Sequence, residues 1–77
     1  MGKRWLPCKR QNFIRKLRKL GFGELQHGTK HDFMPYGDYD QTLPSNREYS
    51  VSQLRLLLRE VEKILGRKIT LDEWNSL

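Results

Sequence analysis

The sequence predicts an α+β domain in which two helices pack on one face of a three-stranded antiparallel sheet. Two stretches, 9–20 and 51–65, carry apolar residues at helical spacing. The segment between them, 22–49, has no helical period and contains five Gly and Pro residues that would interrupt a helix. At 77 residues, the chain forms one domain, 1–77, with a modest core.

The first predicted helix covers 9–20. Its apolar residues fall on one stripe: Phe13, Ile14, Leu17 and Leu20. Pro7 suits the approach to a helix, and Gly21 suits the left-handed position just past a helix end. Arg18 and Lys19 in the last turn favour the negative end of the helix dipole.

The middle of the chain is expected to form a meander of three short strands, at about 22–27, 31–36 and 41–46. The predicted turns are His27–Lys30 and Gly37–Asp40, which have the Gly and Asp content of hairpin connections. Pro35 and Pro44 cannot donate to a strand ladder, so each is expected at an edge or near a strand end.

The second predicted helix, 51–65, has a clear apolar face: Leu54, Leu57, Leu58, Val61, Ile64 and Leu65. Ser50 and Gln53 form a capping box at its start, which contributes about 1 kcal/mol. Gly66 ends the helix. Leu56 points away from the apolar face, and a single exposed leucine is ordinary.

A short helical turn is predicted near the C-terminus. Thr70 and Glu73 form a second capping box, and the turn is expected to run through Trp74. We expect Leu71, Trp74 and Leu77 to fold back and cover apolar surface.

Positive charge is concentrated in the first part of the chain. Residues 1–31 carry nine Lys and Arg residues and one acidic residue, a net charge of +8. Residues 32–77 carry six Lys and Arg residues and eight acidic residues, a net charge of −2. This asymmetry indicates an anionic partner, either nucleic acid or an acidic protein. A basic surface without a partner is the alternative.

The composition excludes several classes of protein. One cysteine, Cys8, excludes an internal disulfide framework and a thiolate metal cage, and it fits a reduced, cytoplasmic compartment. No apolar stretch approaches the roughly 20 residues that span a bilayer. The charged start lacks the apolar region of a secretory signal. The two histidines and the scattered acids lack the spacing of metal ligands, so we expect no metal and no cofactor.

The first predicted turn contains a candidate proton-transfer group. The run Gly28–Thr29–Lys30–His31 holds a histidine out from a basic chain, beside a lysine. Imidazole has an unperturbed pKa of about 6.5, so both protonation states are available near neutral pH. RNA carries its own nucleophile, the 2′-hydroxyl, so a nuclease needs only to hold the phosphate, take a proton and give one back. His27 is a second candidate, and a solvated histidine without a role is the alternative for both.

A basic cluster lies opposite the apolar stripe of the first helix. Arg15, Arg18 and Lys19 stand three and four residues apart, where like charges destabilise an isolated helix by roughly 0.2–0.5 kcal/mol a pair. No acidic residue on this helix relieves them. The cluster therefore predicts a face that binds phosphate or carboxylate groups, with a solvated face as the alternative.

The predicted order of helix, three-stranded meander and helix is the architecture of double-stranded-RNA-binding domains. Within this order the chain resembles the HicA toxins, the messenger-RNA interferases of HicA–HicB toxin–antitoxin pairs. The resemblance covers residues 7–77 and rests on five stretches: Phe13–Phe22, Gly28–His31, Leu43–Asn46, Leu54–Leu65 and Leu71–Trp74.

The resemblance implies a type II toxin that cleaves single-stranded messenger RNA without a metal and is neutralised by an acidic HicB-type antitoxin. It implies that His31 is the single catalytic histidine and that Gly28 and Thr29 shape its turn. Independently of the resemblance, we expect the cation Lys30 to contact the phosphate and stabilise the charge that develops on it. The chain departs from the family at two places. Lys30 stands where some members have the histidine, and Ser45–Asn46 stand where many have a further histidine.

Two other functions stay open. A non-catalytic RNA-binding module would use the same fold and basic surface without the chemistry of His31. A helical DNA-binding domain is disfavoured by the Gly and Pro residues in the middle of the chain.

Overall fold

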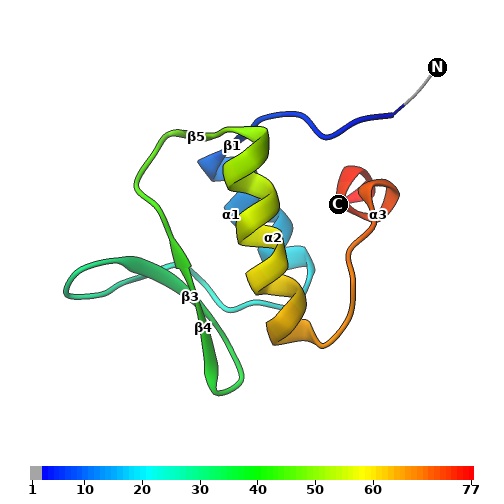
Figure 1. Cartoon of the computed structure of the whole chain (residues 1–77). Helices are drawn as coiled ribbons and strands as arrows, with labels where there is room; N and C mark the ends of the chain where they lie inside the picture. The colour runs from blue at the N-terminus through cyan, green and yellow to red at the C-terminus, as the bar shows by residue number, and fades with distance from the viewer. Residues whose placement is uncertain (1–2) are drawn as a thin grey trace.

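The two long helices of the computed structural model, which describes residues 3–77, begin and end close to their predicted residues. Helix α1 covers Arg10–Lys19 and helix α2 covers Val51–Leu65 (Figure 1). The Ser50 hydroxyl accepts a hydrogen bond from the Gln53 N–H at 3.2 Å, so Ser50 is the predicted N-cap. The Gln53 side-chain amide donates to Asn46 Oδ1 at 3.2 Å, so only the Ser50 half of the predicted capping box is confirmed. Gly66 ends α2 with a φ of 75°, a left-handed conformation that glycine adopts without strain.

The predicted C-terminal turn is a short helix, α3, over Leu71–Ser76. The Thr70 hydroxyl caps it by accepting from the Glu73 N–H at 3.1 Å. Trp74 is buried and Leu77 packs against the core, which confirms the prediction for these two residues, whereas Leu71 is only half-buried and is not among the side chains packed on the core.

The three-stranded antiparallel sheet is confirmed, with strand order β2-β3-β4. Its strands cover Gln26–His27, Asp32–Tyr36 and Tyr39–Leu43. The turn between β3 and β4 contains only Gly37 and Asp38, and the predicted turn over 37–40 was too long. β4 therefore begins at residue 39 rather than 41, and it ends just before Pro44, which has no N–H to donate.

The predicted strand over 22–27 was also too long, because only its last two residues pair. Gln26 lies opposite Phe33 and His27 opposite Asp32. If the pairing continued, Glu24 would lie opposite Pro35, and the ladder would need an N–H that proline lacks. There the Gly23 N–H donates to the Pro35 carbonyl at 2.7 Å, and the neighbouring Phe22 is buried in the core.

A second, two-stranded sheet was not predicted. β1, Cys8–Lys9, pairs antiparallel with β5, Glu48–Tyr49. Two-residue strands carry no alternation that a sequence pattern can reveal. This pair matters because it fixes the start of α1 beside the connection between β4 and β5, where the Arg10 N–H also donates to the Arg47 carbonyl at 2.8 Å.

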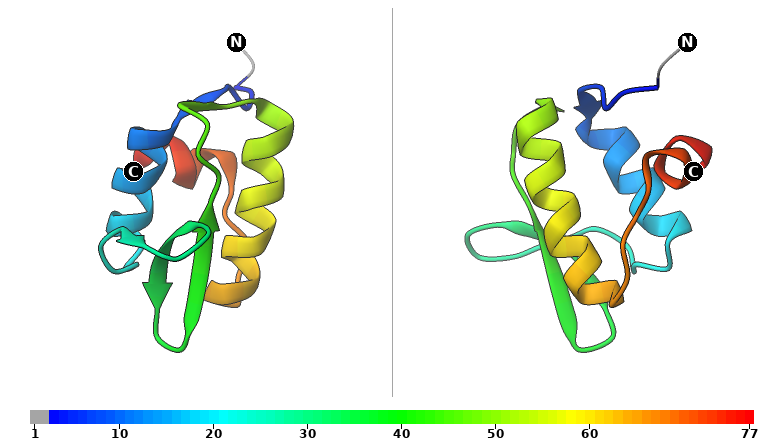
Figure 2. Two further views of the ribbon diagram at one scale, coloured as in Figure 1. Left: turned by 90° about the vertical axis from the view of Figure 1, so that its left-hand side faces the viewer. Right: turned by 45° about the vertical axis from the view of Figure 1, so that its right-hand side comes forward.

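The core lies between the sheet and the helices. Figure 2 shows α1 and α2 side by side, with the β3–β4 hairpin on one side of them and α3 on the other. One buried cluster joins all these elements and includes Phe13, Leu17, Met34, Leu43, Tyr49, Leu54, Val61 and Trp74. Phe13 lies at its centre, with ring centroids 5.4 Å from Tyr49 and 5.7 Å from Trp74.

Candidate functional site

The turn between β2 and β3 projects away from the helices (Figure 1). The structure places it at Gly28–His31, one residue later than the predicted turn at its start and end, so His31 lies in the turn and β3 begins at Asp32. The Gly28 N–H donates to the His31 carbonyl at 3.0 Å. A Cβ atom at Gly28 would lie 2.5 Å from that carbonyl oxygen, so a side chain at this position cannot fit without moving the turn.

A chain of three polar side chains lies at the base of this turn. The His27 Nδ1 atom is 2.8 Å from Asp32 Oδ1, and Arg10 Nη2 is 2.6 Å from Asp32 Oδ2. Arg10 Nε also donates to the Pro44 carbonyl at 3.1 Å. Arg10 thus links the start of α1 to β3 and to the end of β4. Because Arg10 holds the Asp32 carboxylate in place, that carboxylate can in turn orient the His27 ring.

The two partners of Asp32 favour its ionised form. The hydrogen bond from His27 lowers the pKa of the Asp32 carboxyl from its usual value, and the hydrogen bond and charge of Arg10 lower it further. An ionised carboxylate can only accept hydrogen bonds, so the proton in the bond to His27 belongs to Nδ1. The Nε2 atom is then the one that can exchange a proton with a ligand.

His27 is open to a ligand on its other side. Its side chain is 80% exposed, whereas that of Asp32 is 29% exposed. A half-buried carboxylate that orients an exposed imidazole is an arrangement suited to general acid–base chemistry. Neither Asp32 nor Arg10 was among the predicted site residues. A signal for Asp32 was present, since a four-residue turn over 28–31 places residue 32 opposite His27.

The predicted site residues Thr29, Lys30 and His31 are exposed on the turn. Within residues 3–77 their side chains form no hydrogen bond or ion pair. His27 immediately precedes the turn and His31 is its last residue, so the two histidines flank the segment Gly28–Lys30. A catalytic role for His31 stays a prediction.

The basic cluster of α1 is a separate feature. Arg15, Arg18 and Lys19 are exposed, as expected for the face opposite the apolar stripe. Arg15 donates to the Leu77 carbonyl at 3.3 Å and Arg18 to the Phe22 carbonyl at 3.0 Å. In the described part of the chain, no hydrogen bond or ion pair joins the cluster to the β2–β3 turn. Phosphate binding by this cluster also stays a prediction.

The three tyrosines of the chain differ in exposure. Tyr49 is fully buried, and the Tyr36 ring lies 4.9 Å from that of Phe22. Tyr39 is 62% exposed. Only Tyr39 and, in part, Tyr36 therefore offer an aromatic surface to a ligand.

No family model, curated protein or solved structure matches this chain. No helix within residues 3–77 is long and apolar enough to cross a membrane. The same residues contain no group of three or more His, Cys, Asp or Glu side chains that could hold a metal ion.

Proposed function

We propose that this protein is a metal-independent endoribonuclease that cuts single-stranded messenger RNA. The observation that carries the proposal is the exposed β2–β3 turn of a basic chain, with His31 as its last residue and, just before it, His27, which is bonded to Asp32. Together with the resemblance to HicA toxins and the double-stranded-RNA-binding-domain-like order of elements, this supports a toxin that an acidic HicB-type antitoxin neutralises.

The reaction needs two proton-transfer groups. The 2′-oxygen attacks the adjacent phosphorus, its proton passes to a base, and the P–O5′ bond breaks as an acid protonates the leaving 5′-oxygen. The products are a 2′,3′-cyclic phosphate and a free 5′-hydroxyl. We assign one proton transfer to His31 and the other to the Nε2 atom of His27, because the Nδ1 atom of that ring is bonded to Asp32. One such group contributes typically 10²–10⁴-fold to a rate.

Charge stabilisation comes from the lysine on the turn. Negative charge develops on the non-bridging oxygens as phosphorus becomes five-coordinate, and a nearby cation stabilises it. Lys30 lies next to His31, has an exposed side chain, and is the cation that we assign to this role. The basic cluster of Arg15, Arg18 and Lys19 would recruit RNA from solution and would contact the antitoxin's carboxylates.

The proposal is tested by cleavage of single-stranded RNA in EDTA by the wild type and single variants. We expect His31→Ala to abolish cleavage, and His27→Ala to reduce it by at least about 10²-fold. Asp32→Asn should reduce the rate and move its pH profile, because Asp32 acts by positioning His27. Circular dichroism checks that each variant is folded. Wild-type rates in both histidine variants would exclude this site.

The second candidate is an RNA-binding module without catalysis, which the same exposed cations on the turn and on α1 favour. It predicts that RNA binds and stays intact in EDTA with every variant, and that loss of Lys30 weakens binding while loss of His31 does not.

A further inference from the structure

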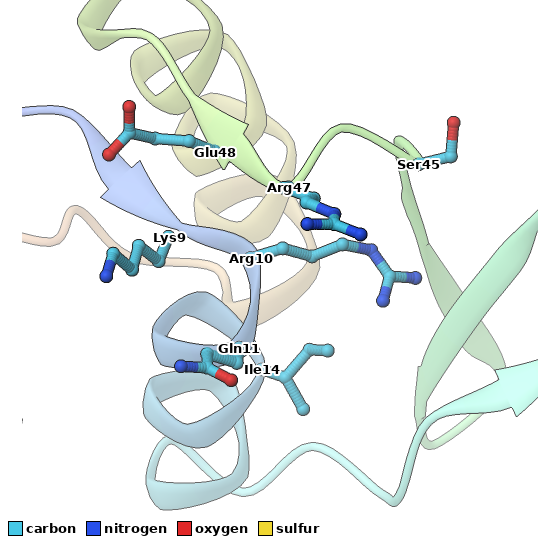
Figure 3. Close-up of a pocket in the computed structure, with 7 residues that line it drawn as sticks. All are labelled: Lys9, Arg10, Gln11, Ile14, Ser45, Arg47 and Glu48. Carbon is cyan, nitrogen blue, oxygen red and sulfur yellow. The ribbon is translucent and has the colours of Figure 1, made fainter.

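An open hollow of about 710 Å³ lies where the start of α1 faces the connection between β4 and β5. Its volume is in the range of small-molecule sites. Lys9, Arg10, Ile14, Ser45, Arg47 and Glu48 are among the residues that line it (Figure 3). We call it the Arg47 hollow. None of the predicted site residues lines it.

The cations of the hollow are not equally available. Arg10 already bonds to Asp32 and to the Pro44 carbonyl. Lys9 and Arg47 are exposed, and across residues 3–77 neither side chain forms a hydrogen bond or ion pair. Figure 3 shows the Arg10 side chain extending toward the β3–β4 hairpin and the Arg47 side chain on the same side of the hollow, whereas the carboxylate of Glu48 points the opposite way. The side of the hollow formed by the two arginines is thus cationic, and the N–H donors of the Arg47 guanidinium have no partner among residues 3–77.

The hollow is physically joined to the histidine site. The Arg10 guanidinium lines the hollow and also holds Asp32, which holds His27. A ligand bound against Arg10 is therefore connected to His27 through one intervening side chain, that of Asp32. The half-buried Ile14 adds an apolar wall, and the exposed Ser45 adds a hydroxyl.

We propose that the Arg47 hollow binds a phosphodiester group of the RNA strand that flanks the bond to be cut, with Arg47 as its principal contact. This inference rests on the proposed function, since it supplies that function with a substrate subsite. A planar guanidinium presents two parallel N–H donors to phosphate oxygens, which is the contact that gives arginine its strength in phosphate recognition. Ile14 offers its apolar surface to the adjoining sugar or base.

The test separates binding from cleavage. A fluorescent 2′-O-methyl oligoribonucleotide, which lacks the nucleophile and cannot be cut, is titrated with the full chain across a salt series. We expect Arg47→Gln to weaken binding about tenfold and to reduce the salt slope by about 0.7, the value for one phosphate contact of a single strand. Arg47→Lys should keep the slope and lose part of the affinity, because it keeps the charge without the fork.

The matched control is Arg59→Gln. Arg59 is exposed on α2, and its side chain forms no hydrogen bond or ion pair within the described residues. It should bind the oligonucleotide like the wild type. Equal losses in Arg47→Gln and Arg59→Gln would mean diffuse charge attraction and would overturn the subsite. Wild-type affinity and slope in Arg47→Gln would overturn it as well.

The outcomes distinguish the subsite from the nuclease. If RNA is cut but Arg47→Gln binds normally, the subsite is wrong and the nuclease stands. If the wild type binds without cutting and Arg47→Gln binds weakly, the nuclease is wrong and the subsite stands. No binding by the wild type overturns both. A loss of affinity in Arg47→Gln for a hexaglutamate peptide, but not for the oligonucleotide, would assign the hollow to an acidic protein and overturn the RNA subsite.

Discussion

At the residue scale, Asp32 connects the packing of the fold to its chemistry. It is the only carboxylate among residues 3–77 that is bonded to both an arginine and a histidine. Arg10 stands 22 residues away in the chain, so the contact exists only when α1 has docked on the sheet. The orientation of His27 therefore depends on correct tertiary packing.

This dependence predicts how stability responds to acid. The pKa of Asp32 is lower in the folded chain than its ordinary value of 3.8. Such a carboxylate stabilises the fold above its unfolded pKa, and the contribution disappears as pH falls through the folded pKa. Between roughly pH 5 and pH 2, the wild type should therefore lose more free energy of unfolding than Asp32→Asn. Urea titrations measure this, and Asp38→Asn, in the exposed turn, should follow the wild type. Equal losses in the wild type and Asp32→Asn would contradict the assignment.

Gly28 and Gly37 make a second comparison at this scale. A Cβ at Gly28 meets the His31 carbonyl, whereas one at Gly37 meets nothing within 4 Å and suffers only from its φ of 58°. Gly28→Ala should thus move the turn and shift the NMR resonances of both histidines. Gly37→Ala should cost about 1–2 kcal/mol of stability and leave those resonances in place. Unmoved histidine resonances in Gly28→Ala would show that the turn does not need its glycine.

At the element scale, the helices were predictable and the short strands were not. Periodic apolar residues located both ends of α1 and α2 to within one residue, since those signals are local. The cap at Thr70 located the start of α3, which ends two residues beyond the predicted Trp74. The extent of β2 is set by Pro35 on the neighbouring strand, and β1 and β5 are two-residue strands held by long-range pairing. For the same reason the sequence pointed to the turn and its histidines, but not to Arg10.

The cap of α2 gives a prediction at the element scale. Ser50→Ala removes the acceptor of the Gln53 N–H and should lower the free energy of unfolding by about 1 kcal/mol. Ser52→Ala is the control, because Ser52 is exposed inside the same helix and should change stability by less than about 0.5 kcal/mol. Thermal unfolding compares the two. The cap would be unimportant if both variants melted alike.

At the scale of the whole molecule, α3 closes the side of the core opposite the sheet. Trp74 is 3% exposed, packs on Phe13, and carries the Lys16 ammonium 4.7 Å from its ring centroid. Trp74→Ala should cost about 3–5 kcal/mol, a large share of the roughly 5–15 kcal/mol that stabilises a small domain. The measurement is urea unfolding beside Leu56→Ala, whose leucine is 58% exposed and should contribute little. Similar midpoints in the two variants would mean that α3 is not part of the core.

We propose that this basic α+β domain cuts RNA with RNA's own 2′-hydroxyl. The most direct measurement compares two oligonucleotides of identical base sequence, one ribose and one 2′-deoxyribose, each incubated with the wild type in EDTA. We expect the ribose strand to be cut to fragments ending in 2′,3′-cyclic phosphate and the deoxyribose strand to stay intact. Cleavage of both strands, or of neither, would contradict it.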